Sequence, residues 1–107
     1  MELKELRRGQ ESVTLALQGR LDALTAIDFD KLIRERLGDT SRAQIDCSEL
    51  DYISSAGLRV MLSTAKRLKE QGGELRLAAL KETVATVFKI SGFDKIIPIA
   101  SSVDDDF

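Results

Sequence analysis

The chain has 107 residues, of which 43% are hydrophobic and 32% are charged, and its formal net charge is −2 at neutral pH. This size and balance predict a single domain over residues 1–107, and the dispersed charges argue against a nucleic-acid partner. Histidine is absent from the sequence. That absence excludes a Ser-His-Asp triad, a phosphorelay histidine and most zinc sites.

Apolar runs in the sequence are only a few residues long, whereas a helix that crosses a bilayer needs roughly 20 apolar residues. The N-terminus is charged where a signal peptide would have an apolar core. We therefore expect a cytoplasmic protein that does not insert directly into a membrane. Cys47 is the only cysteine, which rules out an intramolecular disulfide, and we expect this residue in the core.

Alternating apolar and polar residues predict two strands at the start of the chain, over residues 2–7 and 12–18, paired as a hairpin. A helix is expected to begin near Thr25, whose hydroxyl would cap free amides in a capping-box pair with Asp28. Gly38 is well placed to end this helix. Its apolar stripe consists of Ala26, Phe29, Ile33 and Leu37.

The later elements alternate between strands and helices. In order they are a strand at residues 43–47, a helix that begins at Ser54 or Ser55 and is stopped by Gly72-Gly73, a strand at residues 74–80, a short helix capped by Thr83 and ended by Gly92, and a strand at residues 95–99. Strands joined by helical crossovers prefer to be parallel. The predicted fold class is therefore α/β, with a mixed, mostly parallel sheet in the order β-β-α-β-α-β-α-β and helices packed against it. Residues 101–107 are acidic and are expected to form a mobile tail.

Several kinds of chemistry are disfavoured by the motifs that the chain lacks. The serines at 54 and 55 are not in a G-x-S-x-G context, no P-loop is present, and no paired carboxylates suggest a metal site. A response-regulator receiver has a similar size and alternation, but Asp22 is isolated and Asp46 falls within a predicted strand. We expect no catalytic residue, no bound metal and no cofactor.

The sequence YISSAGLR, residues 52–59, places two hydroxyls between a strand and a helix, and we call it the serine corner. A serine at a helix start can cap an unpaired amide. The same position presents a hydroxyl at the positive end of the helix dipole, where a phosphoryl group would be tolerated. From the residues alone, a structural cap and a modification target both remain open.

Residues 45–62, from Ile45 to Leu62, resemble the signature of STAS domains, in particular the bacterial anti-sigma factor antagonists. The segment Gly19-Arg20-Leu21-Asp22, followed by Thr25-Ala26, resembles the other signature of that family. The two motifs lie in register with the family, and the resemblance extends over nearly the entire chain. It implies a STAS fold and a switch protein that is not an enzyme.

In that family the unmodified protein binds an anti-sigma factor that is also a serine kinase, and so releases the sigma factor. The kinase phosphorylates a serine at the start of the second helix, and a PP2C-type phosphatase reverses the modification. Carried over, the resemblance implies Ser55 as the acceptor, with Ser54 as the second choice and as a support of the corner. The residues implied to contact the partner are Asp22, Ser54, Ser55, Ala56, Gly57 and Arg59.

The chain departs from many family members at three positions, where Ser54 replaces an aspartate, Ala56 replaces a serine and Arg59 replaces a glycine. Arg59 lies one helical turn from Ser55 and could pair with a phosphate or with an acidic partner residue. The alternative function is a STAS scaffold in a signalling complex, or an accessory subunit of an ABC lipid transporter, without a sigma factor.

Overall fold

A computed structural model describes all residues, 1–107. Its elements in chain order are β1 (Glu2–Arg8), β2 (Ser12–Leu21), α1 (Thr25–Leu37), β3 (Arg42–Ile53), α2 (Ser55–Glu70), β4 (Glu74–Ala78), α3 (Glu82–Ser91), the short 3-10 helix η1 (Phe93–Lys95) and β5 (Ile99–Ala100). This order is the β-β-α-β-α-β-α-β succession predicted from the sequence.

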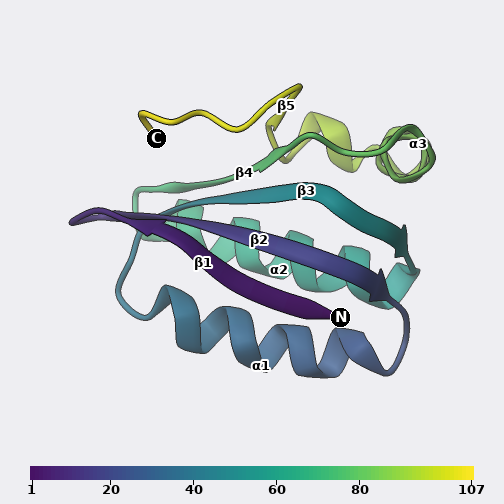
Figure 1. Cartoon of the computed structure of the whole chain (residues 1–107), viewed down its shortest axis with the longest axis horizontal. Coiled ribbons are helices and arrows are strands. Elements are labelled where there is room, and N and C mark those ends of the chain that lie inside the picture. The colour runs from purple at the N-terminus through teal and green to yellow at the C-terminus, as the bar shows by residue number, and fades with distance from the viewer.

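The five strands form one sheet in the order β1-β2-β3-β4-β5. β1 runs antiparallel to β2, and every later neighbouring pair is parallel. Helices α1 and α2 pack against each other and lie side by side on one face of the sheet, which we call the inner face (Figure 1). The predicted α/β class, a mixed and mostly parallel sheet with a hairpin at one end, is confirmed.

The core lies between the inner face and the helices. Every second residue of β2 points into it, namely Val13, Leu15 and Leu17, because side chains alternate across a strand. Cys47 of β3 is fully buried, as predicted. Its burial raises the pKa of the thiol to about 12, so the sulfur stays protonated at neutral pH.

Two predicted helix caps are wrong. Thr25 is the first residue of α1 rather than its cap, and its hydroxyl lies 2.7 Å from the carbonyl oxygen of Arg20 instead of on a later amide. The free amides at this end bond to the side chain of Asp22, and Asp28 makes no hydrogen bond there. At α3 the residue before the helix is Lys81, so Thr83 lies too far into the first turn to cap it.

The strand bounds also differ from the prediction. β1 and β2 run farther than predicted, to Arg8 and Leu21. β3 continues to Ile53 because its second half stays paired with β2 across a register shift. β4 ends at Ala78, since Ala79 adopts a positive φ of 60° that breaks the strand. β5 has only two residues, Ile99 and Ala100, because the preceding residues turn in η1 and Pro98 has no N–H to donate to the ladder.

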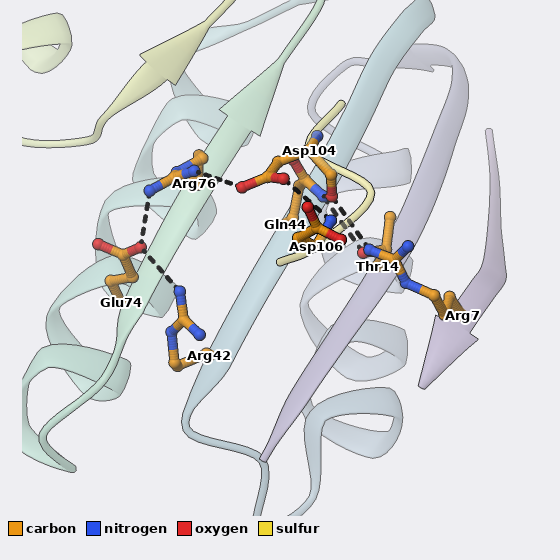
Figure 2. Close-up of polar contacts among 8 residues, drawn as sticks. All are labelled: Arg7, Thr14, Arg42, Gln44, Glu74, Arg76, Asp104 and Asp106. Atoms are coloured by element: carbon orange, nitrogen blue, oxygen red, sulfur yellow. Dashed lines mark hydrogen bonds and ion pairs between the residues drawn. The ribbon is translucent and has the colours of Figure 1, made fainter. Parts of the chain in front are cut away.

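Residues 101–107, the C-terminal segment, fold back over the outer face of the sheet, which is the face opposite α1 and α2 (Figure 2). Phe107 is buried there, and the backbone of Asp104 bonds to the side chain of Gln44. These contacts argue against a mobile tail. The mobility that the sequence predicts stays a prediction.

Gly73 provides a test of the packing at the start of β4. An added Cβ would lie 1.7 Å from the carbonyl oxygen of Ser41, a backbone atom that cannot rotate away. Gly73→Ala should therefore lower the free energy of unfolding by about 3 kcal/mol, near the upper end for overpacking. Gly72→Ala is the control, because this neighbour has open space around it but a φ of +83°, and it should cost about 1 kcal/mol. Urea unfolding measures both, and equal losses would contradict the close approach at Gly73.

Candidate functional site

The two sequence motifs meet at one edge of the sheet. β2 and β3 are parallel and remain paired to their last residues, Leu21 and Ile53. The next residues along the chain, Asp22 and Ser54, therefore lie at the same edge, and α1 and α2 both begin there (Figure 1). The Ser54 amide donates a 2.8 Å hydrogen bond to the Leu21 carbonyl, which ties the two chain segments together.

Ser54 is the N-cap of α2. Its backbone is extended, with φ −91° and ψ 174°, and its hydroxyl accepts a 3.2 Å hydrogen bond from the Gly57 amide. An extended residue with a side-chain oxygen at this position satisfies one of the free amides of a helix start. The structure thus places the capping contact on Ser54 rather than on Ser55.

Gly57 lets the first turn of α2 lie directly on the end of β2. A Cβ at this position would lie 2.9 Å from Cγ1 of Ile53 and 3.0 Å from Cβ of Leu21. Gly57 is buried, whereas the neighbouring Ala56 is half-buried. The glycine of the motif therefore sets how closely the helix start, and the serines on it, approach the sheet.

Ser55 is the first residue of α2, and its side chain is exposed. Its hydroxyl makes no hydrogen bond within the chain. The first turn of α2 carries no acidic residue, in contrast to α1 with Asp28 and α3 with Glu82. An anion on the Ser55 oxygen would therefore meet the positive end of the helix dipole without a carboxylate beside it in that turn.

Asp22 caps α1 at the same edge. Its Oδ1 accepts hydrogen bonds from the amides of Thr25 at 2.9 Å and Leu24 at 3.0 Å, and lies 3.1 Å from the Thr25 hydroxyl. The bonds from Thr25, its amide first and then its hydroxyl, lower the pKa of the Asp22 carboxyl. Asp22 is thus held as a carboxylate next to the serine corner.

Two apolar residues near the serine corner were not predicted to belong to the site. Leu24, just before α1, and Ile27, in its first turn, are 78% and 66% exposed. A shallow hollow between α1 and α2 is lined by Ala23, Ala26, Ile27, Asp30, Ala56, Arg59 and Val60. The sequence did hold a signal, because Leu24 and Ile27 fall outside the helical spacing of the buried stripe of α1.

Arg59 is exposed. It lines both this hollow and a second, more basic groove farther along α2. The groove is lined by Arg34, Arg59, Leu62, Ser63, Lys66, Arg67 and Glu70. Burial, and then the nearby positive charge of Arg34, lower the pKa of Arg67. The surface that begins at the serine corner is therefore apolar near the start of α1 and positively charged farther along the two helices, where Arg34 of α1 joins the cations of α2.

The structure shows no group of three or more His, Cys, Asp or Glu side chains arranged to hold a metal ion. None of its helices combines the length and the apolar character that crossing a membrane requires. What the arrangement offers chemically is a free hydroxyl at a helix start, with an apolar rim and nearby cations. The fold and the corner together define a small α/β domain whose candidate site is an open surface.

Comparison with known proteins gives the family. The model of the STAS domain matches residues 4–106, and the chain belongs to the STAS domain family. BtrV of Bordetella bronchiseptica, whose name places it among anti-sigma factor antagonists, is 46% identical over 87% of this chain and 74% of its own length. The anti-sigma-B factor antagonist of Bacillus subtilis is 28% identical over 91% of this chain and 89% of its own.

Solved structures support the same fold. The anti-sigma factor antagonist SpoIIAA in its unphosphorylated form superimposes with a TM-score of 0.80, at 20% identity, over 98% of this chain and 90% of that one. The phosphorylated form of the Bacillus protein SpoIIAA superimposes with a TM-score of 0.72, at 19% identity, over 98% and 94% of the two chains. At these identities the likeness establishes the fold.

The two serines of the corner should respond differently to truncation. Ser54→Ala removes the hydroxyl that accepts from the Gly57 amide and should lower the free energy of unfolding by about 1 kcal/mol. Ser55→Ala removes an exposed hydroxyl that has no hydrogen-bond partner, so the free energy of unfolding should change by less than about 0.5 kcal/mol. Urea unfolding of both variants makes the comparison, and a larger loss for Ser55→Ala would contradict the assignment of the cap.

Asp22 should make stability depend on acid pH. Because its pKa is lowered on folding from the ordinary 3.8, the ionised cap stabilises the fold fully above that value. The contribution is lost as the pH falls through the lower, folded-state pKa. Carboxyl NMR titration should place the pKa of Asp22 below 3.8.

Unfolding experiments across the same pH range provide the second measurement. Asp22→Asn should be less stable than the parent near neutral pH, with the difference shrinking in acid. Asp28→Asn is the control, since Asp28 lies in the first turn of the helix that Asp22 caps and its side chain makes no hydrogen bond. A pKa of 3.8 or more for Asp22, or a stability difference that does not change with pH, would refute the cap assignment.

Proposed function

We propose that this domain is an anti-sigma factor antagonist. The unmodified chain binds an anti-sigma factor that has serine kinase activity, docking over the serine corner, and phosphorylation of Ser55 ends the complex. A PP2C-type phosphatase restores the binding form. The support is of two kinds, the names of the relatives and the geometry of the corner.

The relatives support the type of partner. BtrV and the Bacillus subtilis protein carry names of anti-sigma factor antagonists, and the chain covers most of the length of each. SpoIIAA has been solved in phosphorylated and unphosphorylated forms, which supports phosphorylation as the switch in this fold.

The observation that carries the proposal is the free hydroxyl of Ser55 at the first position of α2, at the same edge of the sheet where Leu24 and Ile27 expose apolar side chains at the beginning of α1. The apolar side chains supply area that a partner can bury. A phosphoryl group at Ser55 adds about −1.5 to −2 charges at the edge of that area. Burying this charge under a partner would require desolvation, which weakens binding while leaving the domain folded.

The test uses the full chain with its cognate anti-sigma factor and ATP. Mass spectrometry should find the phosphate on Ser55, and Ser55→Ala should bind the partner whether or not ATP is present. Ser55→Asp should weaken binding at least about tenfold, the equivalent of about 1.4 kcal/mol. Isothermal titration calorimetry measures the affinities.

Ser63→Asp is the matched control, because it adds the same charge to an exposed position farther along α2, in the basic groove and outside the serine corner. It should bind the partner more tightly than Ser55→Asp does. Phosphate on neither Ser54 nor Ser55, or equal binding by the two aspartate variants, would overturn the proposal. Recovery of lipid-transporter or scaffold subunits in a pull-down, without a kinase, would favour the alternative function.

A further inference from the structure

The outer face of the sheet carries a row of polar side chains that converge on one residue of the C-terminal segment. Arg7, Thr14, Gln44 and Arg76 are register partners across β1, β2, β3 and β4, so they form a single line across four strands. Arg7, Gln44 and Arg76 contact Asp104, which lies over the line, and Thr14 bonds to Gln44 (Figure 2). A line of this kind differs from the scattered charges typical of a solvated sheet face.

Gln44 binds the backbone of Asp104 as a neighbouring strand would. Its side-chain oxygen accepts from the Asp104 amide at 2.7 Å, and its side-chain nitrogen donates to the Asp104 carbonyl oxygen at 3.0 Å. The same nitrogen donates to the Thr14 hydroxyl at 3.2 Å, so the amide of this fully buried side chain is satisfied. Arg7 adds a 3.0 Å bond to the Asp104 carbonyl.

Two arginines contact the side chains of Asp104 and Phe107 in the segment. Arg76 lies 3.5 Å from the Asp104 carboxylate. The guanidinium carbons of Arg42 and Arg76 lie 4.3 Å and 5.2 Å from the centre of the Phe107 ring, within the range of cation–π attraction. Phe107 is only 8% exposed. The face therefore recognises a backbone, a carboxylate and an aromatic ring three positions later.

The segment is anchored to the sheet at Asp104 and Phe107 and lies outside the core cluster. The 22-residue core cluster ends at Ile97, and β5 contributes only two paired residues before the segment begins. Ser101, Ser102, Asp105 and Asp106 are exposed. The carboxylate pair with Arg76 is partly exposed to solvent, and pairs of this kind contribute little to stability. Detaching the segment would thus leave the core intact, as in other local openings.

We infer that the outer face is a peptide-recognition site for acidic segments with the pattern Asp-x-x-aromatic, and that residues 104–107 fill it as an exchangeable ligand. A segment of a partner protein that carries this pattern would displace residues 104–107 and bind in their place. Arg7, Arg42 and Arg76 surround the site with positive charge, with Glu74 as the acidic neighbour between Arg42 and Arg76. This charge favours an acidic peptide. The site shares no residue with the serine corner.

The test uses the full chain and a fluorescent peptide with the sequence of residues 101–107, blocked at both ends. Phe107→Ala removes the ring that holds the segment in place and should bind the peptide, as measured by fluorescence anisotropy. The parent chain should bind it at least about tenfold more weakly, because its own segment competes at a high effective concentration. Adding Arg42→Ala to Phe107→Ala should weaken binding again.

A matched peptide with alanine in place of phenylalanine is the control and should not bind. A folded Phe107→Ala chain that does not bind the peptide, or binding that Arg42→Ala leaves unchanged, would overturn the inference. If Phe107→Ala does not fold, NMR of the parent chain decides. Excess peptide should then shift the amide signals of residues 104–107 to those of a free segment, and unchanged signals would overturn the inference.

Discussion

The parallel pairing of β2 and β3 up to Leu21 and Ile53 is the constraint on which the site depends. It brings two turns that are distant in sequence to one edge, and the Ser54–Leu21 hydrogen bond joins them. Gly57 then lets α2 lie against the end of β2. A slip of one residue would turn each side chain of the strand to the opposite face. The direction of Ser55 is therefore a property of strand register as much as of the helix that carries it.

The two-residue period of the strands gives the sheet two different surfaces. On the inner face, apolar side chains of β2, β3 and β4 meet α1 and α2. On the outer face the intervening positions hold Thr14, Gln44 and Arg76, which the C-terminal segment covers. One face holds the domain together, and the other makes contacts that are largely polar. Because the two sets of contacts are separate, binding on the outer face need not disturb the helices that form the corner.

Much of this architecture could be predicted from the sequence, since periodicity is a local signal. Strand alternation and the stripe of α1 located the core correctly, and glycines marked the ends of all three helices. The caps predicted for α1 and α3 failed because a cap depends on the backbone geometry of the preceding turn, so that at α1 Asp22 rather than Thr25 receives the amides. Gln44 carried no signal for its role, because its partner Asp104 lies 60 positions later in the chain. Contacts of that range are set by the tertiary fold.

The chain also lacks the side-chain types that ordinarily change charge near neutral pH. It has no histidine, and burial raises the pKa of its one thiol, Cys47, to about 12. Fluctuations in the acidity of the surroundings therefore leave the charge pattern of the surface largely unaltered. A regulatory surface of this kind keeps nearly the same charge when the pH near neutrality changes. A covalent phosphate adds about −1.5 to −2 charges, and it would therefore change the surface charge far more than a shift in pH near neutrality does.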